Sequence, residues 1–242
     1  MKKYALTNEK IEHNGHKLYR IIALRSFDCV HAGERGGFIE SEYNLSQEDN
    51  YAWVSGDAKV YGNAVVDDDA TVYDNAEVYD NALVCHRAQI TGYAKVFGNS
   101  KICRDGLVDG NATVYGEAVI SGDAFVKGNA RVFGYAHVNG YAIIDGNSAI
   151  SGGGNLSFGY YDEAVIKGSQ DYLIVSPLEP NEIEYAAFYK TEDEKIRVST
   201  PKFIGTITEF ESRVQEANIP LECKNIILEK ISTVRQLFFP ED

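Results

Sequence analysis

Small and aliphatic residues recur every sixth position through the middle of this chain. From position 52 a small residue occupies the first slot, and an aliphatic residue follows two positions later without interruption from Val54 to Leu156, which makes 18 consecutive hexads. A helix cannot place every sixth residue on one face, and a regular strand alternates with a period of two. Short β-branched segments separated by Gly-Asn, Gly-Asp and Asp-Asn therefore predict a chain that turns after each hexad.

The residue after each aliphatic position shows a second, longer period. It is aromatic at every third hexad, in steps of 18 residues. These residues, named here the aromatic ladder, are Tyr61, Tyr79, Phe97, Tyr115 and Phe133. Three hexads per turn predict a triangular parallel β-helix of about six coils. Alanine and valine suit its narrow core, and each backbone group can pair with the coil above or below.

The segment that leads into the first coil resembles a known family. VHAGERGGFI (30–39), Asn44-Leu45-Ser46 and Trp53-Val54 are similar to the corresponding segment of YdcK-like bacterial proteins and related β-helix proteins carried by phages. These belong to the hexapeptide-repeat left-handed β-helix family. The resemblance implies a left-handed coil, phage association, and a homo-oligomer such as a dimer or trimer. It does not imply an activity, because many members are described as acetyltransferase-like from their fold alone.

The pattern divides the chain into three parts. Residues 1–50 are expected to form a hairpin around Asn14-Gly15, a type I′ turn signal, that caps the open end of the coil. Residues 51–170 form the β-helix, whose register breaks after Leu156. Residues 171–242 are expected to form a small α/β domain, with strands at 172–175, 186–189 and 195–198. A capping box at Thr206 or Thr208 starts its first helix, and Pro220 precedes its second. The fold class is thus dominated by β-structure.

Composition narrows the classes of partner. The chain has 36 acidic against 23 basic residues and a net charge of −13. This argues against direct binding of nucleic acid. Such acidity more often serves solubility than function, and the less common interpretation is a surface offered to a basic protein partner. No signal peptide or membrane-spanning run is recognised, and the four cysteines are too widely spaced for a disulfide framework, so we expect a cytoplasmic protein.

One corner of the predicted coil departs from the usual turn residues. Stacked in steps of 18, it holds Asp67-Asp68-Asp69, then Cys85-His86-Arg87, then Cys103-Arg104-Asp105. Three readings stay open. The favoured one is a ladder of opposite charges that offsets the repulsion among the three aspartates. The others are a zinc site and a partner or ligand site that includes His86, Arg87 and Arg104. Cys85 and Cys103 are expected close enough for a disulfide. No metal is assigned.

The aromatic ladder is the second candidate site. Aromatic side chains stacked at coil spacing stabilise a β-helix, but a continuous strip of them is also a surface that a second subunit or the C-terminal domain would cover. We expect the ladder to be the association surface. Two further outward strips, Leu107-Phe125-Ile143 and Val65-Leu83-Val119, add apolar area.

Catalysis has weaker support. A hexapeptide acyltransferase would use an acyl-CoA donor and a histidine, for which His31, His86 and His137 are the candidates. However, the hexads contain no inserted loop that could shape a pocket. The sequence also has no P-loop, dinucleotide-binding or nucleophile-elbow motif. We assign no catalytic residue and no cofactor, and consider an enzyme the less favoured interpretation.

These observations favour a non-catalytic, acidic β-helix binding protein, associated with phages by resemblance, that engages a macromolecular partner. One concrete form is an inhibitor of a host nucleic-acid-binding or defence machine, in which carboxylates stand in for phosphates. The alternatives are the acyltransferase and a sponge for a small molecule or nucleotide.

Overall fold

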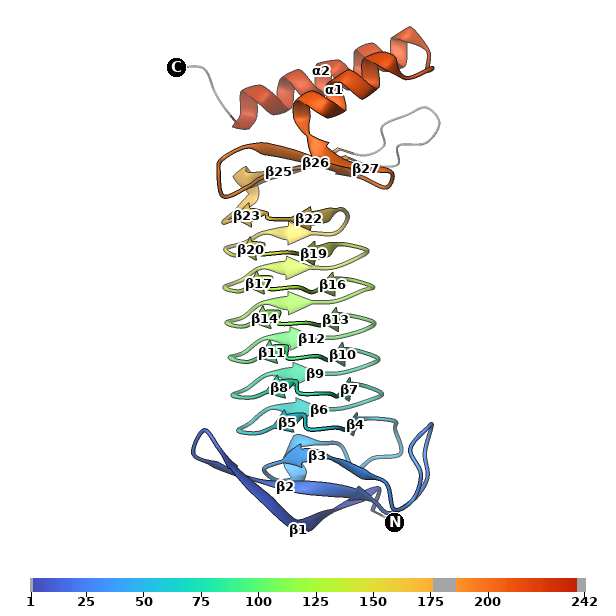
Figure 1. Cartoon of the computed structure of the whole chain (residues 1–242), viewed down its shortest axis with the longest axis vertical. Coiled ribbons are helices and arrows are strands. Elements are labelled where there is room, and N and C mark those ends of the chain that lie inside the picture. Colours follow the sequence, from blue (N-terminus) through green and yellow to red (C-terminus); the bar gives the residue numbers. More distant parts are fainter. Residues whose placement is uncertain (1, 176–185, 239–242) are drawn as a thin grey trace.

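The computed structural model describes residues 2–175 and 186–238. An N-terminal hairpin, a three-walled parallel β-helix, and a C-terminal sheet with two helices follow one another along the long axis of the molecule (Figure 1). The predicted β-helix with a small C-terminal domain is confirmed. The left-handed sense stays a prediction. Residues 176–185 and 239–242 of the expected C-terminal segment lie outside the described residues.

Short strands, mostly of two residues, build the three walls of the β-helix, and each strand pairs in parallel with the strand one coil away. The first wall contains β5 (Lys59–Val60), β8 (Glu77–Val78), β11 (Lys95–Val96), β14 (Thr113–Val114), β17 (Arg131–Val132), β20 (Ala149–Ile150) and β23 (Val165–Ile166). The second wall contains β6 (Val65–Val66), β9 (Leu83–Val84), β12 (Lys101–Ile102), β15 (Val119–Ile120), β18 (His137–Val138) and β21 (Asn155–Leu156). The third wall contains β4 (Trp53–Val54), β7 (Thr71–Val72), β10 (Gln89–Ile90), β13 (Leu107–Val108), β16 (Phe125–Val126), β19 (Ile143–Asp145) and β22 (Tyr160–Asp162).

The core of the β-helix consists of the two hexad positions that define the repeat. Ala76 and Val78, for example, have no exposed surface, whereas Glu77 between them points outward. Backbone hydrogen bonds join each coil to the next in a regular pattern. The N–H of Glu77 donates to the carbonyl of Ala94 at 2.9 Å, and the N–H of Tyr79 donates to that of Val96 at 3.0 Å. The hexad pattern therefore encodes both the apolar interior and the hydrogen bonds that stack the coils.

The N-terminal segment covers the first coil, as predicted. β1 (Tyr4–His13) and β2 (His16–Ala23) form an antiparallel hairpin, and β3 (Arg35–Ile39) joins it to β5 of the first wall. Asn14 and Gly15 have φ angles of 51° and 83°, as the predicted turn requires. A short 3₁₀ helix, η1 (Glu42–Asn44), follows. The edge of the coil is thereby continued into the hairpin instead of being left open.

The last coil is shorter than the others, which explains the break in register. Along the second wall His137 pairs with Asn155, 18 residues on, but Ile143 pairs with Tyr160 and Ala149 with Val165. The spacing thus falls from 18 to 17 and then to 16 residues. The repeat resumes at β23, which is therefore the last strand of the first wall. Its position differs from the 18-residue period by two residues. The third wall has seven strands, so the β-helix makes about seven turns, one more than predicted.

The C-terminal domain covers the other end of the β-helix. After η2 (Ser169–Asp171), an antiparallel sheet contains β24 (Tyr172–Val175), β25 (Ala186–Lys190), β26 (Ile196–Thr200) and β27 (Phe203–Thr206). The inner strand β25 faces two cores. Its residues Ala187 and Tyr189 pack into the β-helix core, while Ala186 and Phe188 pack against the helices. The sheet therefore lies between the last coil and the helical layer, as Figure 1 shows.

Two helices form that outer layer, and both begin where the sequence predicts. α1 (Ile207–Glu216) starts with a capping box between Thr206 and Glu209. α2 (Leu221–Phe238) follows Pro220 directly. Their buried residues include Phe210, Ile227, Ile231 and Val234. No described helix is long and apolar enough to cross a membrane.

Candidate functional site

The aromatic ladder forms a regular stack at the corner between the first and second walls. Successive ring centroids lie 4.8–5.1 Å apart, and the ring planes differ by only 3–5°. Each inner ring therefore covers the faces of its two neighbours, which leaves Tyr79, Phe97, Tyr115 and Phe133 half-buried. This arrangement supports the stabilising role of the ladder. Its role as an association surface stays a prediction.

The N-terminal hairpin covers one end of the ladder. Tyr61 is 3% exposed and packs with Leu18 and Phe38. The ring of His16 lies 4.9 Å from that of Tyr61, and Asn14 donates a hydrogen bond to the Tyr61 hydroxyl at 3.1 Å. The C-terminal sheet and helices instead contact β22, β23 and η2 at the far end of the coil. The hairpin, which the sequence does not connect with the ladder, thus buries its first ring.

Part of the predicted pairing between coils is present at the corner that holds Asp67, Asp68 and Asp69. Arg87 donates two hydrogen bonds to the Asp105 carboxylate on the next coil, at 2.7 and 2.8 Å. The Asp68 carboxylate accepts the backbone N–H of His86 at 3.0 Å. Asp67 accepts a hydrogen bond from Asn50, and Asp69 accepts the N–H of Tyr51. The opposite-charge ladder is therefore present between the coils of Arg87 and Asp105. The exposed Arg104 has no side-chain hydrogen bond or ion pair among the described residues.

The cysteines form no disulfide among the described residues, and the histidine candidates are dispersed. Cys85 and Cys103 are both buried and unpaired. His31 is exposed and its ring contacts the backbone carbonyl of Cys29 at 3.2 Å. His137 is exposed on the outer face of the second wall. His86 lies at the corner that follows that wall. The structure therefore does not gather the histidines into one catalytic cluster.

A continuous row of outward apolar side chains runs along the third wall, next to the C-terminal sheet. We name it the junction face and define it by the outward residues Leu107, Phe125, Ile143 and Tyr160 together with the exposed Tyr141, Phe158 and Ile204. The first four are consecutive partners across paired strands, and each is half-buried. Tyr141, Phe158 and Ile204 are 66%, 39% and 41% exposed. The strip Leu107-Phe125-Ile143 expected from the sequence is thus the lower half of a longer surface.

A pocket opens at the upper end of the junction face. It has a volume of about 450 Å³ and lies where the last coils meet β27. Its lining includes Tyr141, Ile143, Tyr160, Lys202, Phe203 and Ile204. The pocket combines apolar walls from two parts of the chain with polar groups at its rim, which is typical of a site that receives a side chain of a partner.

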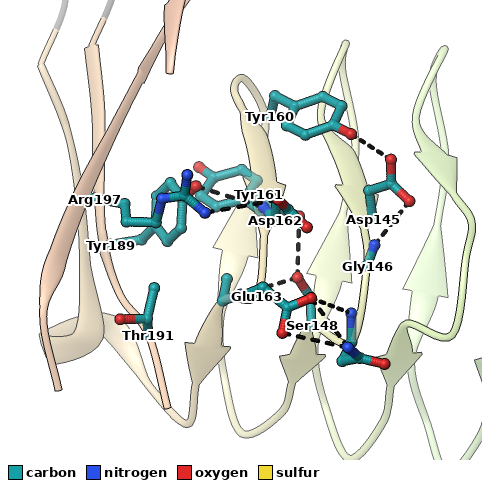
Figure 2. A network of polar contacts seen from close by, with 12 residues as sticks. Asp145, Gly146, Ser148, Tyr160, Tyr161, Asp162, Glu163, Tyr189, Thr191 and Arg197 are labelled. Carbon is teal, nitrogen blue, oxygen red and sulfur yellow. Dashed lines mark hydrogen bonds and ion pairs between the residues drawn. The ribbon is translucent and has the colours of Figure 1, made fainter. Parts of the chain in front are cut away.

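Polar contacts hold the last coil and the C-terminal sheet in place beside this pocket (Figure 2). The Ser148 hydroxyl donates to the carbonyl of Tyr161 at 3.0 Å and accepts the N–H of Ala164 at 2.9 Å. Asp162 forms an ion pair with Arg197 of β26 at 3.6 Å. The contacts connect the short coil both to the coil below and to the sheet above. The junction face is therefore built on rigid elements.

Charge surrounds the apolar part of the junction face. Tyr160 donates a hydrogen bond to Asp145, and this bond, together with burial, raises the pKa of Tyr160 to about 12. Burial alone would raise the pKa of Asp145, but hydrogen bonds from Tyr160 and Gly146 and the nearby Lys127 hold it below its usual value. The Lys127 ammonium lies 5.2 Å from the centre of the Phe125 ring and 3.1 Å from Asp145.

Carboxylates also border the face on both sides. Asp105 and Asp123 precede the outward residues of the third wall by two positions, and Asp109, Asp145 and Asp162 follow them. Arg87, Lys127 and Arg197 pair with three of them, Asp105, Asp145 and Asp162. Asp109 and Asp123 have no ion pair among the described residues.

The comparison with known proteins adds no assignment. The sequence of this chain matches no protein-family model and no curated protein.

Proposed function

We propose that this protein is a non-catalytic binding protein that engages a macromolecular partner, a protein with a basic contact surface, through the junction face. The observation that supports this most is the continuity of the face: an apolar column on the rigid third wall leads into a pocket shared with the C-terminal sheet. Contiguous apolar side chains on a protein surface often mark an interaction site.

The rest of the architecture supports a side-wall contact. The hairpin covers one end of the β-helix and the C-terminal sheet covers the other, so neither end presents an open sheet edge to a partner. Other outward apolar residues among the described ones include the aromatic ladder, whose rings already cover one another, the strip on the second wall, and Leu221, Ile226 and Leu237 of α2. The junction face combines outward aliphatic and aromatic side chains with a pocket that could hold an anchor residue.

Charge favours a basic partner. The net charge of −13 steers cationic surfaces toward the molecule. Asp109 and Asp123, which have no ion pair among the described residues, would pair with lysine or arginine beside an apolar anchor. Together with the resemblance to phage-borne proteins, this supports an inhibitor of a host machine that normally binds nucleic acid. In that role the carboxylates would occupy the place of phosphates.

The test is a pull-down from host lysate with two matched double variants. Phe125→Lys with Ile143→Lys places two cations on the junction face, whereas Val65→Lys with Leu83→Lys places them in the same outward slots of the second wall. Both variants change the net charge equally. We expect the wild type and the second-wall variant to capture the same protein, identified by mass spectrometry, and the junction variant to lose it.

Circular dichroism checks that each variant keeps the β-rich fold. Equal capture by both variants would contradict the assignment of the junction face. Loss of capture by the second-wall variant alone would place the contact on the second wall instead.

A further inference from the structure

Three potential metal ligands meet at the corner between the second and third walls. The Nδ1 atom of His86 lies 3.3 Å from the sulfur of Cys85 and 3.8 Å from a carboxylate oxygen of Asp68. All three ligand atoms lie within 4.8 Å of one another. Cys85 is buried, whereas the side chains of Asp68 and His86 are 53% and 59% exposed. The cluster is therefore reachable from solvent on one side and enclosed on the other.

The spacing of these atoms is close to that of a metal tetrahedron. Metal–sulfur and metal–nitrogen bonds of about 2.3 and 2.0 Å at tetrahedral angles place neighbouring ligand atoms roughly 3.3–3.6 Å apart. The distance of 3.3 Å from His86 Nδ1 to the Cys85 sulfur lies in this range, and the distance of 3.8 Å from Nδ1 to the Asp68 oxygen is slightly longer. Small rotations of the exposed Asp68 and His86 side chains would suffice to bring the third edge to the same length.

We propose that Asp68, Cys85 and His86 bind a divalent cation of the zinc class, with one carboxylate oxygen, the thiolate sulfur and Nδ1 as ligands. Water completes the fourth position. Thiolate and imidazole ligands favour zinc-class cations over magnesium or calcium, which prefer oxygen. This inference is independent of the proposed function, because none of the three ligand residues belongs to the junction face and no step of that proposal uses them.

Binding must displace one proton. The cation forms a bond to the Cys85 sulfur as the S–H bond breaks, and the proton goes to solvent.

The charges around the corner permit a cation. Asp67, Asp68 and Asp69 are successive carboxylates, whereas Arg87 is engaged by Asp105 on the next coil. Lys101 and Arg104 lie on that coil as well, and they oppose the cation. Lys3 also faces Asp67 and Asp69. The three carboxylates therefore equal in number the three cations Lys3, Lys101 and Arg104.

The chain itself supplies matched replacements for the ligands. His86 has a φ of 59°, and the equivalent corner two coils further on is Ser121-Gly122, where Gly122 has a φ of 69°. Cys85→Ser and His86→Gly therefore install residues that this fold already accepts at that corner. Cys103→Ser is the control, because it removes the buried thiol at the same corner position one coil away, outside the three-residue cluster.

The experiment uses cobalt(II) as a spectroscopic probe on the full-length, tag-free protein with the exposed Cys29 replaced by serine. We expect a saturable thiolate-to-cobalt charge-transfer band at one cobalt per chain, abolished by one equivalent of zinc. Cys85→Ser should remove the band, and His86→Gly or Asp68→Asn should weaken binding by at least about tenfold. Cys103→Ser should leave it unchanged.

Several outcomes would overturn the proposal. These are the absence of a band in the parent protein, a band that survives Cys85→Ser, and a band lost in Cys103→Ser while the fold persists by circular dichroism. Because Asp68→Asn alters only an exposed carboxylate, it tests the site even if a corner variant unfolds.

Discussion

Tyr160 donates a hydrogen bond to the carboxylate of Asp145 on the neighbouring coil. This bond joins two coils at the place where the repeat shortens, and it holds the Tyr160 ring beside Ile143 at the rim of the pocket. The hydrogen bond between Tyr160 and Asp145 therefore joins the last coils and also shapes the junction face. Stability at this end of the molecule and the proposed binding surface depend on the same residues.

The architecture predicts that the core will not accept a charge. Val78 has no exposed surface, so Val78→Asp would bury an unpaired carboxylate in the centre of the coil. We expect a loss of about 3–5 kcal/mol in the free energy of unfolding, measured by chemical denaturation.

Thr113→Asp is the matched control on the same wall. Thr113 points outward, and its partners on the neighbouring coils are Lys95 and Arg131, so a carboxylate there gains opposite charges. A Val78→Asp variant as stable as Thr113→Asp would show that the proposed inward and outward positions are wrong.

Lys3 predicts a pH dependence of the N-terminal cap. Its side chain is buried, donates to Asn50 at 2.7 Å and lies 5.4 Å from the centre of the Phe27 ring. Burial, helped by Arg25, lowers the pKa of Lys3 from 10.5 to about 8, although Asp67, Asp69 and Asp49 oppose the shift. Between these two pKa values the unfolded chain binds the extra proton, so stability rises with pH.

We therefore expect the free energy of unfolding to increase by roughly 1 kcal/mol from pH 8 to pH 9, beyond the change seen in Lys3→Met. Below pH 8 the difference between the two proteins should become constant. Lys2→Met, which removes a neighbouring lysine whose side chain is 59% exposed, should keep the wild-type slope. An identical pH profile for wild type and Lys3→Met would contradict the prediction that Lys3 is buried with a lowered pKa.

The aromatic ladder predicts a measurable stacking contribution. Phe97 stacks on Tyr79 at 4.8 Å and on Tyr115 at 5.0 Å, so Phe97→Ala removes two ring pairs. We expect a loss of about 1–3 kcal/mol from these pairs, in addition to the lost burial, by chemical denaturation.

Tyr93→Ala serves as the control, because Tyr93 is 65% exposed at a different corner and has no aromatic neighbour among the described residues. If Phe97→Ala is as stable as Tyr93→Ala but elutes as a smaller species on gel filtration, the ladder is a contact between subunits. The prediction that the ladder acts as an internal stack would then be wrong.

The acyltransferase alternative makes a distinct prediction. His86 and His137 are exposed, and the described hexads are connected by short corners from which no loop extends. We expect titration of the protein with acetyl-CoA to give no saturable heat at sub-millimolar concentration. Saturable binding that disappears in His86→Gly or His137→Ala would instead support an acyl-CoA site.

The repeated part of the fold could be predicted closely from the sequence. Because strands one coil apart pair with a constant offset, adding 18 to a residue number correctly placed Arg87 beside Asp105 and Tyr79 beside Phe97. The hairpin turn and the start of α1 follow from local rules for Asn-Gly turns and capping boxes. These features depend only on neighbours in sequence or on a fixed period.

The lower half of the junction face follows from the 18-residue period, but its upper half could not be predicted, because the period fails there. Adding 18 to Ile143 gives Tyr161, which is buried, whereas the strand partner that continues the apolar column is Tyr160. The pocket also needs β27, whose position depends on how the C-terminal sheet packs on the last coil. Likewise, nothing local indicates that Lys3 is buried, since Asn50 and Phe27 reach it through the tertiary fold.

Site-directed photo-crosslinking tests the proposed binding surface most directly. A photoreactive phenylalanine analogue is placed at Phe125 on the junction face or, in a separate protein, at Leu83 on the second wall, two outward positions that are both half-buried. After irradiation in host cells, we predict one discrete crosslinked protein from position 125 and none from position 83. The same crosslinked protein from both positions, or from position 83 alone, would contradict a partner bound at the junction face.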